Sequence, residues 1–490
     1  NGVISIVSEN CDDPTNTEQG FVYATTIQPT TANNKVNVNG TDISTTLENL
    51  ESNTTYYARS FLTNALGEFY GNEVSFMTNE SICEVVYLAE NGITIKACDD
   101  ANVGDTGVVN GVTYTVVNEA MLREMVLNEE DVTKVATTKV TDMSYFFFID
   151  SDTNSDFNQD ISTWDVSSVT DMNRMFRKAT NFNQPIGNWD VSSVTNMRSM
   201  FSDAIAFNQD ISSWDVSSVT DIGSMFFGNE SFNQPIGNWD ASNVTTMECM
   251  FCSATAFNQP IGNWDVSSVT TMKRMFSDTP FNQDINNWDV SSVTDMSQMF
   301  FGNESFNQPI GNWDVSNVTA MGSMFYQATA FNQPIGDWDV SSVTTMVGMF
   351  DNAGSFNQDI NNWDVSNVTD MRLLFQDAVF NQPIGNWDVS SVSTMQWMFS
   401  GATAFNQPIG NWDVSSVTDM SYMFKNARFN QDIGAWDVSS VTGMSQMFSN
   451  ANFFNQDISS WDVDGVISCN QFSIGLPPEN IPNFTNCNPN

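Results

Sequence analysis

A tryptophan recurs at nearly fixed spacing through most of this 490-residue chain. Successive tryptophans are 25 residues apart, except at three steps of 24 residues. Each lies in a copy of one segment, first seen as FNQDISTWDVSSVTDMNRMF at residues 157–176. A period of this length is typical of stacked repeats, in which each unit buries its apolar face only against its neighbours. The thirteen repeated tryptophans are Trp164, Trp189, Trp214, Trp239, Trp264, Trp288, Trp313, Trp338, Trp363, Trp387, Trp412, Trp436 and Trp461.

Within one repeat, the apolar residues follow two patterns. Residues 161–166 are apolar at the first, fourth and sixth places, which matches the strand of a leucine-rich repeat. The apolar residues of 169–176 follow at spacings near three, which indicates a short helix or 3₁₀ turn on the opposite side. Parallel strands of successive repeats would lie about 4.8 Å apart, and their apolar columns would fill one continuous core. The Asn and Gln of the FNQ segment are expected to form inward hydrogen-bonded ladders.

The other parts of the chain predict three further regions around the repeats. Residues 1–80 alternate between polar and apolar and predict a β-domain. A small β/α connector and N-terminal cap is expected at 81–135, and a C-terminal cap at 466–490. The repeats themselves occupy 136–465 and begin with a half-repeat at 140–147. Strands of the β-domain are expected at 3–7, 20–27, 56–65 and 73–78.

The connector carries clear local signals. Two strands are joined by Asn91-Gly92, which is a strong hairpin signal. A third strand precedes Asn118, the expected N-cap of a helix over 119–130. This helix would cover the open end of the repeats, because exposed end strands invite aggregation. The three strands are expected at 85–89, 93–97 and 111–117.

The charge balance excludes some classes of partner. The chain has 15 Lys and Arg against 58 Asp and Glu, a formal net charge of −43. Such a surface repels nucleic acid and anionic lipid; it either attracts cations or serves to keep a secreted chain soluble. No run of 18 apolar residues occurs, so no membrane insertion is expected. Because the sequence begins at Asn1 in mid-pattern, we expect a processed or partial product of a longer precursor.

The seven cysteines indicate an oxidising, extracellular setting. Two pairs would staple the two ends of the repeat array. Cys249 and Cys252 lie in one repeat and either pair or stay free, while Cys11 has no evident partner. A Cys-x-x-Cys spacing alone is weak evidence for a metal, because no second pair and no His completes four ligands. The two predicted disulfides are Cys83–Cys98 and Cys469–Cys487.

The absence of histidine argues against an enzyme. Every arrangement of Ser or Cys with His, and every zinc site that uses His, is excluded. The carboxylates repeat identically, so no pair stands out as the acid and nucleophile of a glycosidase. We therefore predict a protein with no catalytic residues.

One carboxylate follows each repeated tryptophan and would form a column of like charges. Neighbours about 4.8 Å apart repel by about 3.5 kcal/mol at an effective dielectric of 20, so the column needs compensation. Either cations bind and bridge it, or each carboxylate accepts backbone N–H bonds from the following Ser-Ser-Val turn; the regular Ser-Ser favours the turn. These candidate binding residues are Asp165, Asp190, Asp215, Asp240, Asp265, Asp289, Asp314, Asp339, Asp364, Asp388, Asp413, Asp437 and Asp462.

A second candidate site resembles the first half of a calcium loop, with oxygen-bearing side chains at alternate places. It departs from an EF-hand, since Ser155 stands where Gly is required and Ile161 where Glu is required. The alternative is a polar loop between the half-repeat and the first full repeat. The candidate calcium ligands are Asp150, Asp152, Asn154 and Asp156.

The unit FNQ-[DP]-I-x-x-WDVSSVTDM-x-x-MF closely resembles the bacterial surface-protein repeat called the BspA-like or DUF285 repeat, over about residues 136–465. This resemblance implies a right-handed solenoid of leucine-rich-repeat type on the bacterial exterior. The preceding segment, VVYLAENGITIKACDDANVGDTGVVNGVTYTVV, is similar to what accompanies this repeat in Bacteroidota surface proteins exported by the type IX pathway. Segments at 47–50, 53–59, 64–67 and 70–76 resemble the second half of a fibronectin type III module, a β-sandwich.

The predicted fold is therefore mainly β with short helices: a right-handed leucine-rich-repeat-like solenoid of parallel strands and an N-terminal fibronectin III-like sandwich. We interpret the chain as a non-enzymatic, adhesin-like structural or binding protein, secreted or on the bacterial cell surface. The alternatives are a carbohydrate-binding module of a larger secreted protein and a structural subunit of an extracellular fibre or sheath. Expected partners are an extracellular protein or glycan surface, or cell-envelope or secretion-system proteins, with calcium as the one candidate cofactor.

Overall fold

The computed structural model describes residues 17–40, 43–47, 50–51, 53–78, 84–148, 150, 153–473 and 476–489. The chain forms two compact units, Asn1–Glu84 (unit 1) and Val85–Asn490 (unit 2). Both are mainly β with few helices. The predicted strand at 3–7 lies outside the described residues.

Unit 1 is an antiparallel sheet of five strands in its described part. The order is β2-β1-β3-β4, and β5 pairs with β3 beside β4. Tyr56 and Ala58 of β3 are buried on one face of the sheet, and Phe61 is buried on the other, because successive side chains of a strand alternate between its faces. A second sheet facing this one is absent from residues 17–78 as far as they are described, so the sandwich stays a prediction. The strands are β1 (Glu18–Ala24), β2 (Asn34–Asn37), β3 (Thr55–Asn64), β4 (Gly67–Tyr70) and β5 (Val74–Met77), which confirms the predictions at 20–27, 56–65 and 73–78.

Unit 2 begins with the connector, whose strands and helix form where the sequence predicts them. The hairpin around Asn91 pairs β6 with β7, and β9 pairs with both β8 and, in parallel, β10. The Asn118 side chain accepts a hydrogen bond from the Met121 N–H at 3.0 Å and caps α1. The helix ends earlier than predicted, since Glu129 adopts a left-handed φ of 57°. The elements are β6 (Val86–Leu88), β7 (Ile95–Ala97), β8 (Thr106–Val109), β9 (Val112–Asn118), α1 (Glu119–Leu127) and β10 (Val135–Lys139).

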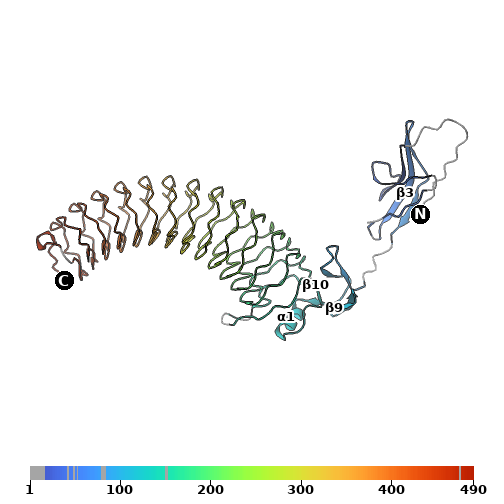
Figure 1. Ribbon diagram of the computed structural model, residues 1–490, viewed down its shortest axis with the longest axis horizontal. Helices are drawn as coiled ribbons and strands as arrows, with labels where there is room; N and C mark the ends of the chain where they lie inside the picture. The colour runs from blue at the N-terminus through green and yellow to red at the C-terminus, as the bar shows by residue number, and fades with distance from the viewer. Residues whose placement is uncertain are drawn as a thin grey trace. The chain divides into compact units, whose positions relative to one another are not determined.

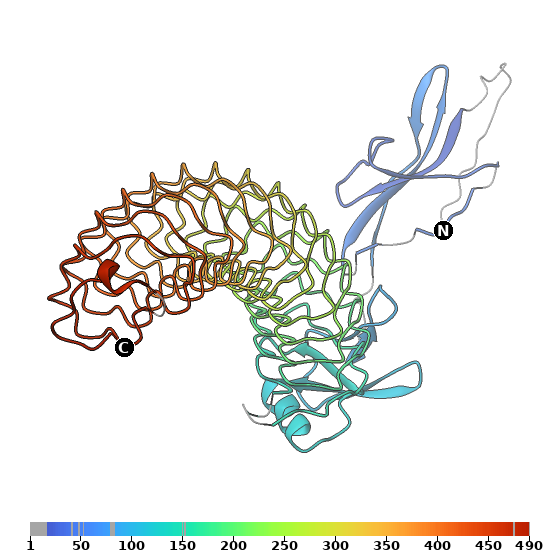
Figure 2. The same ribbon diagram turned by 60° about the vertical axis from the view of Figure 1, so that its left-hand side comes forward.

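The repeats stack as successive turns, which Figure 1 and Figure 2 show as a row that continues from the connector. Single parallel bridges join each turn to the next, beginning with Asp142 to Asp171 and Asp171 to Asn196. Around each bridge, backbone N–H groups donate to carbonyls one repeat later, as Arg174 does to Arg198 at 2.9 Å. We call this hydrogen-bonded side of the turns the backbone ladder. It runs from the bridge residue of each turn, such as Asp171, to just beyond the Phe, such as Phe176.

The predicted positions of strand and helix within a repeat are wrong. Residues 161–166 make a tight turn in which the Trp164 N–H donates to the Ile161 carbonyl at 3.1 Å. The segment expected to be helical, 169–176, belongs to the backbone ladder and contains the left-handed residue Arg174 (φ 56°); Lys178 (φ 59°) follows it. A chain of tight turns also places apolar residues about three apart, so this spacing does not distinguish it from a helix.

The repeated tryptophans are buried, as predicted, with 0–5% of each side chain exposed. They belong to one continuous core with the Val, Ile, Met and Phe columns. Burying one indole contributes about 5 kcal/mol of gross stabilisation, from about 200 Å² of surface removed from water. From Trp189 onward, each indole N–H also donates to an Ile carbonyl of the preceding turn, as Trp214 does to Ile186 at 3.1 Å. Such a partner removes the cost of a buried polar group.

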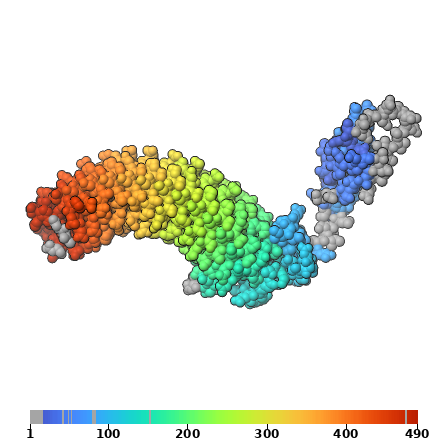
Figure 3. Space-filling model, in the orientation of Figure 1, coloured from blue at the N-terminus to red at the C-terminus, as the bar shows by residue number. Residues whose placement is uncertain are grey.

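Successive turns are not equally spaced on all sides. Hydrogen bonding sets the backbone ladder near 4.8 Å per turn. Phe176 and its equivalents repeat at 5.4–5.9 Å between ring centroids. The tryptophans repeat at 6.2–6.5 Å. The row of turns therefore curves toward the backbone ladder and opens on the tryptophan side, while the space-filling view shows it closely packed along its length (Figure 3).

Side chains replace backbone hydrogen bonds where the turns are far apart. The Asn183 N–H donates to Asn158 Oδ1 at 3.1 Å, and Gln184 Nε2 donates to the same oxygen at 2.9 Å. The Phe column beside this ladder repeats at 5.9–6.4 Å, too far for a direct backbone bond. The predicted FNQ ladder exists, but its inward orientation is wrong, because Asn183 is exposed and Gln184 is half-buried.

Both ends of the row are covered. At the start, Leu122 of α1 is fully buried against the core, and Trp164 Nε1 donates to the Val132 carbonyl at 3.0 Å. At the end, Cys469 and Cys487 form a disulfide, and Phe484 packs on Phe472 at 4.9 Å. A short 3₁₀ helix, η1 (Pro478–Asn480), lies in this C-terminal segment. These caps protect the end turns from pairing with other chains.

Candidate functional site

The carboxylates after the tryptophans close local turns. Asp215 Oδ1 accepts the Ser217 N–H at 3.0 Å and the Ser217 hydroxyl at 2.6 Å. The same backbone bond recurs in every full repeat, at 3.0–3.2 Å. This geometry matches the alternative in which each carboxylate accepts a backbone N–H bond from the turn that follows it. One oxygen of each carboxylate is thus already occupied within the chain, and binding to any ligand would use the other.

Hydrogen bonds also fix the charge of these groups. The Ser217 hydroxyl and backbone N–H hold the pKa of Asp215 below its usual value. A carboxylate whose pKa is lowered in this way is ionised at neutral pH, which makes this side of its turn acidic. The pKa is lowered in the same way at Asp265, Asp289, Asp339, Asp388 and Asp437.

The first member of the column differs from the rest. Asp165 has only 2% of its surface exposed, whereas the next twelve are exposed. Its Oδ1 lies 3.5 Å from Lys96 Nζ, which belongs to β7 of the connector. This ion pair joins the connector to the first full turn and removes Asp165 from the candidate binding residues.

The structure does not assemble the predicted calcium loop in its described part. Asp150 Oδ1 accepts the Thr153 N–H at 2.7 Å, and Asp156 Oδ1 accepts from Asn181 Nδ2 at 3.2 Å. Asp152 lies outside the described residues. Among the residues that are described, no group of three or more His, Cys, Asp or Glu could hold a metal ion. Calcium at Asp150, Asp152, Asn154 and Asp156 therefore stays a prediction.

The disulfides are partly as predicted. Cys469 pairs with Cys487, which confirms the staple at the C-terminal end. Cys249 pairs with Cys252 within one turn, which decides between the two alternatives for these residues. Cys98 is disulfide-bonded, while Cys83 and Cys11 lie outside the described residues.

The sequence interpretation missed a surface on which the repeats differ from one another. In each turn the WDVSSVT segment is nearly identical, but two residues after the first Met and two after the Phe vary. In the first full turn these are residues 173, 174, 177 and 178. All four positions lie on the backbone ladder, so we call them the variable strip. Aligning the repeats with one another would have revealed it.

The variable strip of this acidic chain concentrates positive charge and carries half-buried aromatic rings. Trp397, the only tryptophan outside the repeated column, stacks on Tyr422 at 3.9 Å between ring centroids. Lys425 Nζ lies 5.4 and 5.3 Å from these two rings. Of the nine Lys and Arg between residues 157 and 473, eight are on the strip: Arg174, Arg177, Lys178, Arg198, Lys273, Arg274, Arg372 and Lys425.

One acidic residue of the variable strip is unusual. Asp351 is 7% exposed, and burial together with the nearby Asp377 carboxylate raises its pKa to about 7. Small residues at the equivalent position of other turns, such as Ser277 and Ser400, are also buried, whereas the larger Tyr326 and Gln376 of the adjacent turns are half-buried. A buried acid with a raised pKa marks a candidate functional position, and it also costs stability when ionised.

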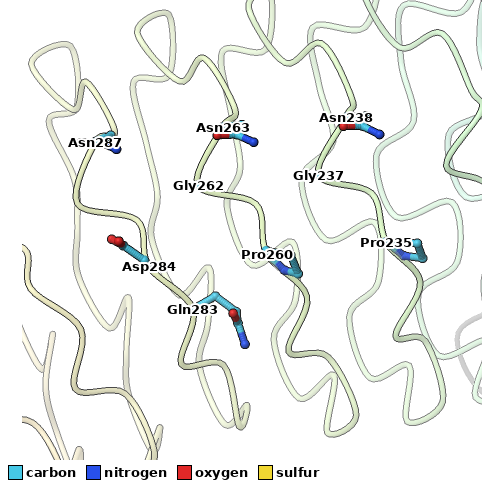
Figure 4. A pocket seen from close by; sticks show the side chains of 9 residues that line it. All are labelled: Pro235, Gly237, Asn238, Pro260, Gly262, Asn263, Gln283, Asp284 and Asn287. Atoms are coloured by element: carbon cyan, nitrogen blue, oxygen red, sulfur yellow. The ribbon is translucent and has the colours of Figure 1, made fainter.

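A separate hollow of about 390 Å³ lies across three turns (Figure 4). Asn238, Asn263 and Asn287 form one row along it, and Pro235, Pro260 and Asp284 a second row. The three asparagines immediately precede repeated tryptophans, on the side where the turns are widely spaced. The lining is completed by Gly237, Gly262 and Gln283.

No helix within the described residues is long and apolar enough to cross a membrane.

Repeats that stack through a backbone ladder, around one aromatic core, define a repeat protein with a uniform framework and one variable surface. The chain belongs to the family described as "Mycoplasma protein of unknown function, DUF285", which matches residues 116–226, 208–286, 278–382 and 370–475. This confirms the resemblance of the repeats to that family. Comparison with curated proteins and with solved structures gave no match.

Proposed function

We propose that this chain is a non-enzymatic binding protein, secreted or on the bacterial cell surface, which recognises an extracellular protein through the variable strip. The stack would be a right-handed solenoid of leucine-rich-repeat type, and unit 1 a fibronectin III-like module that serves as a spacer. We also propose that the protein belongs to a member of the Bacteroidota and is exported by the type IX pathway, and that the loop at Asp150 binds calcium.

The main support for this proposal is that the repeats differ strongly from one another at one set of surface positions, those of the variable strip. A stack of identical turns presents identical surfaces, which suits a structural fibre but gives no specificity. Here the framework residues repeat, while the strip changes in size, charge and aromaticity from turn to turn. Specific recognition needs such a non-repeating surface.

The strongest candidate for the centre of the interface is the aromatic pair. Trp, Tyr and Arg are the residues that most often dominate protein interfaces, and Trp397 and Tyr422 are half-buried and stacked on each other. A stacked pair loses little side-chain entropy on binding, because each ring already holds the other. Leu373 occupies the equivalent position one turn earlier, which extends the apolar surface.

The test is a binding screen of the full chain against an array of extracellular and cell-envelope proteins, followed by surface plasmon resonance. We expect the double variant Trp397→Ala with Tyr422→Ala to weaken binding by at least about tenfold. Tyr87→Ala is the matched control, since Tyr87 is 44% exposed in β6 and lies outside the strip. Absence of any protein ligand, or equal binding by the double variant, would contradict the proposal.

A further inference from the structure

The types of residue that line the hollow in Figure 4 recur along the chain. Its pattern across three turns is Pro, Pro, Asp at the place before the repeated Ile: Pro235, Pro260 and Asp284. The same order returns 74 residues later from Pro309 and again from Pro383. Three turns thus form a larger repeat, and this set of lining residues occurs three times in the chain, the hollow included; we call the surface over each set a groove. The second set is Pro309, Pro334 and Asp359, and the third is Pro383, Pro408 and Asp432.

The backbone geometry is the same in the three sets. A Cβ on Gly237 would lie 2.3 Å from the Pro260 carbonyl oxygen of the next turn. The equivalent contact is 2.6 Å at Gly311 and 2.5 Å at Gly385. A glycine is therefore required at each place, because a Cβ there would collide with the next turn. Where glycine stands, the missing side chain leaves bare backbone; the third turn of the first two sets has Asn286 and Asn361 at the equivalent place.

The groove walls carry amide groups that no other residue uses. Asn238 and Asn263 are exposed, and their side chains make no hydrogen bond within the described residues. At the equivalent position outside the grooves, Asn188 Nδ2 donates to the Ser162 carbonyl at 2.8 Å. The free amides offer both donors and acceptors, and the proline rings offer apolar surface beside them. Each groove contains only one or two carboxylates.

We infer that these three grooves bind a neutral polysaccharide, one segment in each groove. Paired donors and acceptors suit hydroxyl groups, and the near absence of charge in the lining excludes a strongly ionic ligand. Adjacent grooves are three turns apart, about 19 Å at the 6.4 Å spacing of the tryptophans. A polymer of identical units can fill sites at regular intervals, whereas a folded protein rarely presents one motif in such a series. This surface is distinct from the variable strip, so the inference goes beyond the proposed function.

The grooves are not identical, and this difference gives an internal prediction. Asp337 replaces the second asparagine in the second groove, and Ala435 replaces the third in the last. The first groove keeps all three asparagines. We therefore expect the first groove to bind most tightly.

The experiment measures binding of the full chain to a β-glucan, an α-mannan and a galactan, both as polymers and as short oligosaccharides. Calorimetry should give about three oligosaccharides per chain, and the polymer should bind at least about tenfold more tightly. Asn238→Ala with Asn263→Ala should remove one site and weaken polymer binding by about tenfold. Asn188→Ala is the matched control and should change neither value.

Two outcomes would overturn the inference: binding of none of the three polysaccharides, or a stoichiometry that the groove variants leave unchanged. The side chains of Asn238 and Asn263 are exposed, and an unchanged melting temperature would confirm that each variant is folded. The variant Trp397→Ala with Tyr422→Ala should bind polysaccharide normally, and the groove variants should bind the protein ligand normally. Failure of one proposal is thus distinguishable from failure of the other.

Discussion

Individual residues of this chain depart from their repeat equivalents, and Asp351 is the clearest case. Its raised pKa means that the folded state binds a proton more tightly than the unfolded state does. The protonated Asp351 side chain therefore costs no stability below the unfolded pKa, near 4. The free energy of unfolding falls as the pH rises to about 7, because the buried carboxylate must then ionise. Asp351→Asn should leave stability unchanged at pH 4 and raise it by about 1–2 kcal/mol at pH 8.

The measurement is urea unfolding of the wild type and the variant across this pH range. Asp377→Asn is the matched control: it removes the exposed neighbouring charge that helps to raise the pKa of Asp351, so it should give a smaller gain at pH 8. Equal free energies of unfolding for Asp351→Asn and the wild type at pH 8 would show that burying the ionised Asp351 carboxylate does not destabilise the folded state.

Lys96 is a second residue with an individual role. Its ammonium group faces the buried Asp165 carboxylate, whose side chain is 1% exposed. Lys96→Met should destabilise the chain by about 1–3 kcal/mol, because it leaves a buried charge without its partner. Lys134→Met is the control, since the Lys134–Asp131 pair is more than half exposed and should contribute less than about 0.5 kcal/mol. Thermal unfolding compares the two variants, and equal effects would contradict the assignment.

At the scale of one turn, the sequence predicted the core better than the hydrogen bonding. Columns of Trp164 and its equivalents follow directly from a fixed period, because stacking superimposes equivalent residues. The backbone ladder was not predicted, because left-handed residues such as Arg174 let a series of turns imitate the apolar spacing of a helix. The hollow near Asn238 depends on the unequal spacing of turns, a property of the curved stack that no local pattern contains.

Unequal spacing also explains why each turn needs the FNQ segment. Asn332 Oδ1 accepts the Asn357 N–H at 3.0 Å and Gln358 Nε2 at 2.9 Å. Asn332→Ala should cost about 1–2 kcal/mol, because two inter-turn hydrogen bonds are lost where the backbones are too far apart to replace them. Asn312→Ala removes an exposed amide without such bonds and should be nearly neutral. Denaturant titration measures both variants. Equal stability of Asn332→Ala and Asn312→Ala would show that the hydrogen bonds of the FNQ segment do not stabilise the stack.

For the whole molecule, the dominant property is its net charge of −43, and the turns of the stack share one acidic side. Like charges in adjacent turns repel, and their carboxylates are ionised at neutral pH since hydrogen bonds lower their pKa. Added salt screens this repulsion. We expect the melting temperature to rise by several degrees as NaCl increases from about 20 to about 300 mM, measured by calorimetry.

The same experiment separates screening from metal binding. If hydrogen bonds from the serine turns alone compensate the Asp column, CaCl₂ and MgCl₂ at matched ionic strength should shift the melting temperature equally. EDTA should then leave the melting temperature unchanged. A shift specific to calcium that Asp150→Asn abolishes would place the metal in the predicted loop. A shift specific to calcium that survives in Asp150→Asn would instead show that the exposed column, from Asp190 to Asp462, binds the ion through its second oxygens. That result would contradict the view that local hydrogen bonds alone compensate these charges.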